Sequence, residues 1–275
     1  MSTFKRLIPV VLLRNGYVVQ SKGFKRWQML GNPSTVVSRL SNWTADELIY
    51  LDITREGAHD LRRDDLNFEN RHEILEILGD VARKCFMPLT FGGGVRTPED
   101  VRARLAGGAD KVALNTAAFD TPDLIDTCAR EHGAQCIVVS IDARRRDDGG
   151  WEVWVDRGRR PTGRNPVSWA REAADRGAGE VLLGSIDHDG AAQGYDLALI
   201  AEVAGAVRIP VIALGGVGEW AHLGAGLDAG ASAVAAGNIF HYSENSVVHA
   251  ARWLFENGYG VRRPALTSLA REGDL

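Results

Sequence analysis

Eight short runs of apolar, largely β-branched residues recur along the 275-residue chain, with helical segments between them. Such near-continuous apolar runs are typical of strands that are covered on both faces, as in a parallel sheet. The expected strands are Leu7–Leu13, Leu48–Ile53, Pro88–Phe91, Lys111–Leu114, Cys136–Ile141, Val181–Leu183, Pro210–Leu214 and Ala233–Ala236. The alternation predicts an α/β fold, a (β/α)8 TIM barrel formed by residues 1–275 as a single domain; a doubly wound sheet is the structural alternative.

Helix signals and loop lengths fit the same plan. Apolar residues recur on one helical face in 70–84 and 166–176. A capping side chain followed by proline marks three helix starts, at Thr97-Pro98, Thr121-Pro122 and Asn165-Pro166. Two stretches, 15–22 and 144–164, depart from the alternation and predict long loops after the first and fifth strands, the second with a small hairpin at Trp151–Val155. Long loops at the carboxyl ends of barrel strands usually carry function.

An internal repeat divides the chain. Six residues of the first half recur 122 positions later without a gap: Gly93, Gly94, Val95, Gly108, Ala109 and Val112 match Gly215, Gly216, Val217, Gly230, Ala231 and Val234. Two unrelated β/α units could share a Gly-Ala turn, but glycine pairs in register favour two homologous half-barrels, about 1–134 and 135–260.

Each half carries glycines after its third strand and a small or polar tract after its fourth. Glycine lets the backbone approach a ligand and present its N–H groups, which suits a phosphate. The paired tracts therefore predict two phosphate sites across the barrel mouth, and a phosphorylated small molecule or nucleotide sugar as ligand; the alternative is tight turns only. The expected binding residues are Gly93, Gly94, Asn115, Thr116, Asp189, Gly190, Gly215, Gly216, Gly237 and Asn238.

Four aspartates end strands at the same mouth, namely Asp52, Asp142, Asp187 and Asp189. Acids placed there are candidates for general acid/base work, although an aspartate at such a turn can also cap the next helix. Capping is the stronger alternative for Asp189, and catalysis is favoured for Asp142 because it lies inside an apolar run. His188 between two aspartates lacks further ligands, so we expect it to lie at the surface, and we expect no metal and no cofactor.

Composition limits the classes of partner that the chain can have. The net charge is −4, which gives no overall footprint for nucleic acid, and no apolar run approaches the ~18 residues that span a bilayer. Three scattered cysteines predict a reduced, cytoplasmic setting.

Charged residues flank the starts of four strands; they are Arg6, Glu47, Lys111 and Glu180. They could form a closed ion-pair ring or remain solvated flanking charges.

Taken together, these residues resemble the cyclase subunit of imidazole glycerol phosphate synthase over about residues 6–262. The resemblance rests on specific motifs: Glu47-Leu-Ile-Tyr-Leu-Asp-Ile53, Phe91-Gly-Gly-Gly-Val95, the tract 108–118, Val139-Ser-Ile-Asp-Ala143, Gly177-Ala-Gly-Glu-Val-Leu-Leu183, Ser185-Ile-Asp-His-Asp-Gly190 and Gly215-Gly-Val-Gly218. It implies a heterodimer with a glutaminase subunit, whose ammonia enters through a gate formed by Arg6, Glu47, Lys111 and Glu180. Asp110 matches a position that contacts the glutaminase.

One departure from that family concerns its two catalytic aspartates. Asp142 matches the aspartate of the fifth strand, but Leu12 stands where the first strand should carry the other, and Gln20 replaces a lysine of the following loop. Leucine cannot transfer a proton, and loss of one acid of a pair removes a factor of ~10²–10⁴. The run Ile8-Pro-Val-Val-Leu-Leu13 resembles instead a paralogous branch associated with sugar amidation in surface-polysaccharide (lipopolysaccharide) biosynthesis.

Three functions stay open on this basis. The first is a barrel that accepts ammonia from a glutaminase and supports conversion of an N-acetyl sugar to its acetamidino form, with a separate sugar amidotransferase as a further partner. The second is a true cyclase (lyase) of histidine biosynthesis. The third is a non-catalytic barrel that binds a phosphate ligand and activates the glutaminase.

Overall fold

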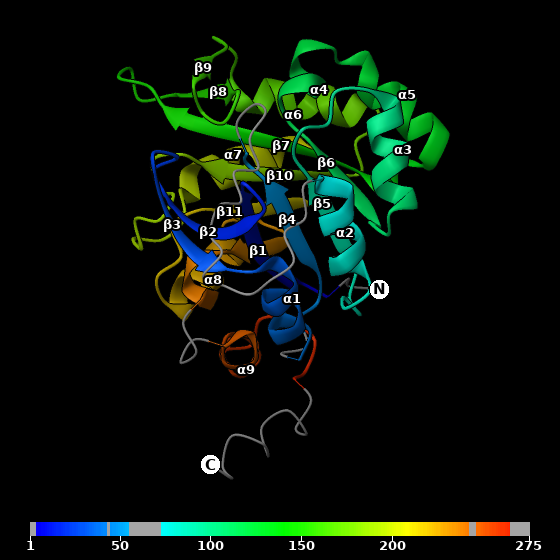
Figure 1. Cartoon of the computed structure of the whole chain (residues 1–275). Helices are drawn as coiled ribbons and strands as arrows, with labels where there is room; N and C mark the ends of the chain where they lie inside the picture. The colour runs from blue at the N-terminus through cyan, green and yellow to red at the C-terminus, as the bar shows by residue number, and fades with distance from the viewer. Residues whose placement is uncertain (1–3, 43–44, 55–72, 242–245, 265–275) are drawn as a thin grey trace.

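The computed structural model describes residues 4–42, 45–54, 73–241 and 246–264 (Figure 1). Within them, eight parallel strands form a closed barrel in the order β1, β4, β5, β6, β7, β10, β11, β12, and β12 pairs with β1. The strands are β1 (Arg6–Arg14), β4 (Leu48–Asp52), β5 (Leu89–Gly92), β6 (Lys111–Leu114), β7 (Ile137–Arg145), β10 (Glu180–Ser185), β11 (Val211–Leu214) and β12 (Ala233–Ala236). The predicted TIM barrel is confirmed, and the doubly wound alternative is wrong because the parallel sheet closes on itself.

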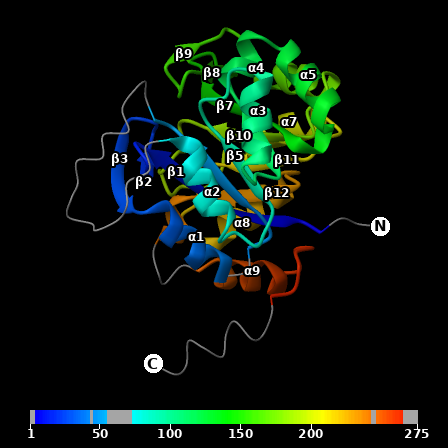
Figure 2. The ribbon, with the colours of Figure 1, turned by 45° about the vertical axis from the view of Figure 1, so that its right-hand side comes forward.

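Helices surround this barrel (Figures 1 and 2). They are α1 (Pro33–Asn42), α2 (Ile74–Ala82), α3 (Pro98–Ala106), α4 (Thr116–Asp120), α5 (Asp123–His132), α6 (Pro166–Asp175), α7 (Leu197–Ala206), α8 (Trp220–Asp228) and α9 (Val247–Glu256), with 3₁₀ turns η2 (Ala134–Cys136) and η3 (Asn238–His241). The expected caps of α3 and α6 are present, because Thr97 and Asn165 accept backbone N–H groups. The expected cap at Thr121 is wrong, since α5 begins at Asp123 with no side-chain cap. Residues 70–72 of the expected 70–84 helix lie outside the described residues.

Two antiparallel arms extend the barrel at the predicted long loops. β2 (Tyr17–Lys22) and β3 (Arg26–Gly31) form a hairpin that continues from β1. β8 (Trp151–Val155) and β9 (Arg160–Pro161) continue from β7, so Trp151–Val155 is one strand of the arm and not a hairpin by itself. Both arms start at carboxyl ends of barrel strands, so they lie around the mouth.

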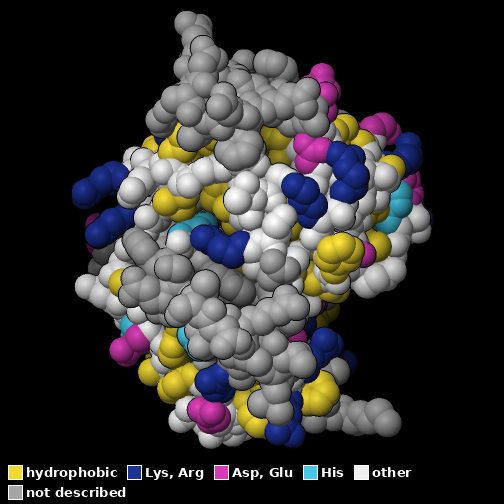
Figure 3. Space-filling view, turned by 60° about the horizontal axis from the view of Figure 1, so that its bottom comes forward, with side chains coloured by type: hydrophobic (Ala, Val, Ile, Leu, Met, Phe, Trp, Pro, Cys, Tyr) yellow, Lys and Arg dark blue, Asp and Glu magenta, His cyan; other side chains and the backbone are white. Residues whose placement is uncertain are grey.

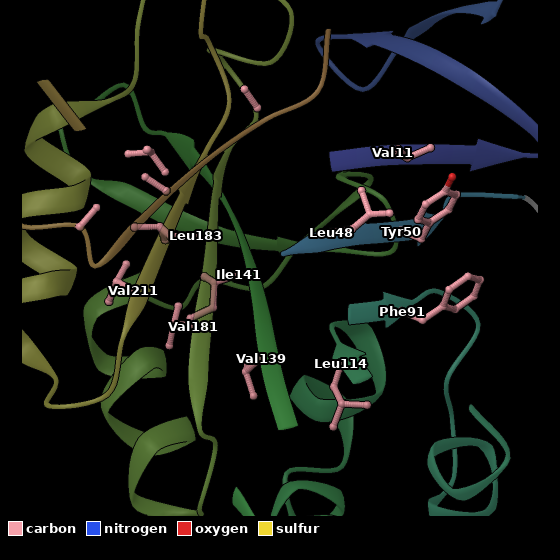
Figure 4. Packing of buried hydrophobic residues seen from close by; sticks show 14 of the residues in the cluster. Val11, Leu48, Tyr50, Phe91, Leu114, Val139, Ile141, Val181, Leu183 and Val211 are labelled. Atoms are coloured by element: carbon pink, nitrogen blue, oxygen red, sulfur yellow. The ribbon is translucent and has the colours of Figure 1, made fainter. Parts of the chain in front are cut away.

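The core has two layers, which follow from the alternation of side chains along each strand. On β1, Leu7, Val11 and Leu13 point outward and pack under the helices. Figure 4 shows members of this outer layer on β1, β4 to β7, β10 and β11. The inner layer fills the barrel with Ile8, Val10, Ile49, Ala113, Val138, Leu182, Ile212, Ala233 and Ala235. The barrel interior is therefore apolar between its two ends.

The surface carries charges of both signs. Figure 3 shows Lys and Arg side chains scattered beside Asp and Glu and among hydrophobic residues on the face that it draws. In the described part of the chain, each helix is too short or too polar to cross a membrane.

Two of the three glycine pairs in the repeat have matching backbone conformations, whereas Gly94 and Gly216 differ, with φ angles of +64° and +103°. The φ angle is +105° at both Gly93 and Gly215, and it is +106° at Gly108 and +105° at Gly230. Such positive φ values favour glycine. The two halves thus turn alike at both ends of the repeat, and their common origin stays a prediction.

Candidate functional site at the mouth of the barrel

A cavity of about 520 Å³ opens at the carboxyl ends of the strands. Residues of all eight barrel strands or of the loops after them line it, together with parts of both antiparallel arms. The lining includes every predicted phosphate-binding residue: Gly93, Gly94, Asn115, Thr116, Asp189, Gly190, Gly215, Gly216, Gly237 and Asn238. Sequence positions that are up to 145 residues apart therefore meet in one space that is large enough for a small-molecule ligand.

The first glycine loop follows β5, and the space around Gly93 admits no side chain. A Cβ atom on Gly93 would lie 2.2 Å from the carbonyl oxygen of Asp52. Asn115 and Thr116, after β6, line the adjacent wall. Backbone and small polar groups thus surround this part of the mouth, as anion binding requires.

The second glycine loop follows β11 and is equally restricted. A Cβ atom on Gly216 would lie 2.0 Å from the carbonyl oxygen of Gly194, whose own N–H donates back to the Gly216 carbonyl at 2.8 Å. In the closed strand order β11 lies four strands from β5 in either direction. The two loops therefore face each other across the mouth, which fits a ligand with a phosphate at each end.

Asp142 lies between these loops on β7, where this strand leaves the barrel and begins to pair with β8. Its Oδ2 accepts a hydrogen bond from Asn115 Nδ2 at 2.9 Å. Burial raises the pKa of the Asp142 carboxyl to about 7, the Asn115 bond opposes the rise, and the charge of Asp189 adds to it. The mouth thus contains one carboxyl group that can exchange a proton near neutral pH.

Leu12 lies opposite Asp142, because β1 and β7 are also four strands apart. Leu12, Leu51 and Leu214 line the cavity and pack on the inner apolar layer. The wall that faces Asp142 is therefore apolar at the position where the resemblance implies a second acid.

The other three predicted acids, Asp52, Asp187 and Asp189, lie in different environments. Asp52 lines the cavity and accepts the Thr54 N–H at 2.9 Å. Asp187 is exposed outside the cavity lining and accepts the Arg145 N–H at 2.7 Å. The structure brings Asp52, Asp142 and Asp189 together and turns Asp187 away.

Asp189 holds the β2–β3 hairpin, and the suggestion that it caps a helix is wrong. Its Oδ2 accepts the Ser21 hydroxyl at 2.7 Å and the Phe24 N–H at 3.0 Å, and its carbonyl accepts the Gly23 N–H at 2.9 Å. Asn238 Nδ2 donates to the Ser21 carbonyl at 2.7 Å. Two of the predicted binding side chains therefore secure the hairpin over the second half of the mouth. His188, expected at the surface, is half-buried, and its Nδ1 lies 2.6 Å from the Gly194 carbonyl oxygen.

Sequence reasoning missed several mouth residues from the arms. Phe24 and Trp27 line the cavity from the β2–β3 hairpin, with the Arg14 guanidinium 4.3 Å from the Trp27 ring centre. Arg157 reaches in from the β8–β9 turn and donates to the Thr54 carbonyl at 2.5 Å. The expected functional loop 144–164 contains Arg157, so loop length was the available signal.

The opposite end of the barrel holds a closed ring of four charges. Arg6 contacts Glu47 at 2.5 Å and Glu180 at 2.8 Å, and Lys111 contacts each glutamate at 3.0 Å. Their side chains are 8–20% exposed, so the alternative of solvated flanking charges is wrong. Asp110 beside the ring is exposed and accepts the Leu89 N–H at 2.8 Å.

The described residues contain no group of three His, Cys, Asp or Glu side chains placed to hold a metal ion. The expectation that the protein works without a metal or cofactor stays a prediction.

Known proteins resemble this chain over nearly its whole length. Residues 6–246 match the protein family described as "Histidine biosynthesis protein". The imidazole glycerol phosphate synthase subunit HisF of Gluconacetobacter diazotrophicus is 42% identical over 257 residues, which cover 94% of this chain and 95% of that protein. The resemblance deduced from the motifs is confirmed, and the closer resemblance to the paralogous branch stays a prediction.

Proposed function

This chain belongs to the family of histidine biosynthesis proteins, and from that membership we propose that it is the barrel subunit of an ammonia-using synthase of the imidazole glycerol phosphate synthase type. In this proposal a glutaminase partner docks at the ring end, near Asp110, and its ammonia passes the ring of Arg6, Glu47, Lys111 and Glu180. The apolar interior then leads the neutral molecule to the mouth, where the acceptor is bound.

The observation that carries the proposal is Asp142 between two facing glycine loops. Each loop presents backbone N–H groups to one phosphate, which fixes both ends of an extended ligand across the cavity. The centre of that ligand then lies beside a carboxyl group whose pKa is about 7. Such a group can both give and take a proton at neutral pH, which ammonia addition and the following eliminations require.

The acceptor of histidine biosynthesis is the candidate that the relatives favour. By the resemblance, this acceptor is the phosphoribosyl formimino-carboxamide compound, which carries a phosphate at each end. With Leu12 opposite, Asp142 supplies acid and base catalysis alone, so we expect turnover below that of a two-acid site by about 10²-fold or more.

A second candidate, amidation of an N-acetyl sugar, is favoured by one observation. Leu12 lies opposite Asp142 and Leu51 lies on the neighbouring strand β4, so the facing wall is apolar there and accommodates an apolar group better than a second charged one. In this candidate the ring and the glycine loops keep their roles, and the mouth serves a nucleotide sugar, with a separate sugar amidotransferase as the further partner.

Turnover assays with both acceptors distinguish the candidates. The barrel is supplied with ammonium salt and either the phosphoribosyl formimino-carboxamide compound or a nucleotide-linked N-acetyl sugar plus its amidotransferase, and growth of a histidine auxotroph lacking the cyclase is scored in parallel. Turnover of the first acceptor that Asp142→Asn abolishes and Asp187→Asn retains supports the histidine candidate. Turnover of the sugar alone supports the second, and turnover of neither acceptor contradicts the proposal.

A further inference from the structure

Arg104 is a buried cation beneath the first glycine loop. It lies on α3 with 3% of its surface exposed. Its Nη2 donates to the Gly93 carbonyl at 2.7 Å and its Nη1 to the Asp100 carbonyl at 3.0 Å. Both bonds go to backbone oxygens, and the first reaches directly into the loop that lines the mouth.

The charge of this guanidinium is compensated only from a distance, by the carboxylates of Asp100 and Asp52. No described carboxylate lies within ion-pair distance of it, and its Nε has no hydrogen-bond partner. The Asp100 carboxylate, from the same helix, is engaged with the N–H groups of Arg96 and Thr97 at 2.8 and 3.0 Å. An arginine remains protonated even when buried, so a positive charge persists under the loop.

The bond to Gly93 also fixes the direction of the next peptide group. In a trans peptide the carbonyl and the following N–H point in opposite directions. Since the Gly93 carbonyl points to Arg104 in the protein interior, the Gly94 N–H points the other way, and Gly94 lines the cavity. Arg104 therefore both orients an anion donor and places a charge behind it.

Among the residues of the second half that the structure describes, no buried arginine occupies the equivalent position. The repeat pairs Arg104 with Gly226, 122 residues later. A Cβ atom on Gly226 would lie 2.8 Å from the Tyr195 ring, so that ring takes the space. The second loop is instead held by the bond from Gly194 N–H to the Gly216 carbonyl, which brings no charge.

We propose that Arg104 is a positioning residue that makes the Gly93–Gly94 loop the stronger of the two anion sites at the mouth. The inference rests on the proposed function, because it assumes that both glycine loops bind phosphate. It adds an orientation to the ligand: the end with the more highly charged phosphate binds over Arg104, because a buried cation without a direct ion pair stabilises a dianion more than a monoanion.

The test measures each loop separately. Protein labelled with ¹⁵N-glycine is titrated with inorganic phosphate at constant ionic strength, and the amide signals of Gly94 and Gly216 give one Kd for each loop. We expect Gly94 to saturate at lower phosphate than Gly216. Arg104→Gln should raise the Kd at Gly94 about tenfold, the usual scale of a charge-assisted contact, and leave Gly216 unchanged. Arg104→Lys, which keeps the charge, should change it less than about threefold.

Matched variants separate positioning from folding. Arg102→Gln removes an exposed arginine of the same helix and should change neither Kd. If Arg104→Gln does not fold, Arg104→Met provides the same loss of charge with less buried polar surface. An unchanged Gly94 Kd in these Arg104 variants, or equal weakening at both loops, overturns the inference. Absence of any phosphate shift in the unaltered protein contradicts the phosphate sites of the proposed function and the inference with them.

Discussion

The pKa of Asp142 makes the stability of the protein depend on pH in a way that one substitution should remove. The carboxyl has an ordinary pKa of 3.8 and reaches about 7 in the folded protein. At 1.36 kcal/mol for each pH unit, this rise corresponds at most to about 4 kcal/mol. Since the side chain is half-buried and faces the cavity, water relieves part of the cost, and we expect about 2 to 4 kcal/mol.

The sign follows from which state holds the proton. Between pH 4 and 7 the folded protein keeps a proton on Asp142 that the unfolded chain has released, so stability falls as pH rises. The contribution of protonated Asp142 is therefore complete below pH 3.8 and is lost as pH rises through about 7. Asparagine resembles the protonated acid and does not titrate. Asp142→Asn should thus match the unaltered protein near pH 4 and be about 2 to 4 kcal/mol more stable at pH 8.

Urea unfolding of both proteins from pH 4 to 8.5 measures this difference, because all other titrating groups are common to the pair. Asp187→Asn, which removes an exposed carboxylate outside the cavity lining, serves as the matched control. A stability difference between the unaltered protein and Asp142→Asn that stays constant across the pH range would refute the reasoning. It would mean that Asp142 titrates alike in both states and is not poised for proton transfer at neutral pH.

Three further predictions concern the ring, the hairpin and the apolar wall. Lys111→Met leaves two poorly exposed glutamates with one cation and should lower the free energy of unfolding in urea by about 3 kcal/mol. Arg102→Met, at an exposed ion pair, should lower it by less than about 0.5 kcal/mol, and equal losses would contradict a closed ring. Asp189→Ala should remove hydrogen-exchange protection at the Phe24 amide while global stability falls by no more than about 2 kcal/mol, and retained protection would show that other contacts hold the hairpin. Leu12→Asp should lower stability by about 2 kcal/mol and, if the acceptor is that of histidine biosynthesis, raise turnover by about 10²-fold or more; unchanged turnover would count against that acceptor.

The sequence was sufficient for the eight barrel strands, because each is a short and nearly continuous apolar run. The ring residues Arg6 and Lys111 precede inward-facing positions by two residues, so their meeting follows once eight strands close into a barrel. The capping box at Thr97 was predictable because it is local: its partner Asp100 is three residues away.

The roles of the mouth side chains were not predictable, because they depend on contacts between distant segments. Asp187 and Asp189 both follow the end of β10, yet only Asp189 meets Ser21, which is 168 residues away. Arg104 looks like an ordinary helix residue, because only the tertiary structure places its guanidinium beneath Gly93. Neither fact leaves a local pattern in the sequence, whereas glycines at positive φ do.

Leu12 shows how the mouth can change its chemistry while the rest of the barrel keeps its parts. Leu12 is inward-facing like Ile8 and Val10, so leucine satisfies the packing that this column of β1 requires. Arg6 begins the same strand six residues earlier, a distance of about 20 Å in an extended chain. Residues that far apart and without shared partners affect stability independently. A leucine at the mouth can therefore remove one acid without loosening the ring, so the proposed ammonia route and phosphate loops can serve either acceptor, and the choice between acceptors lies at the wall opposite Asp142.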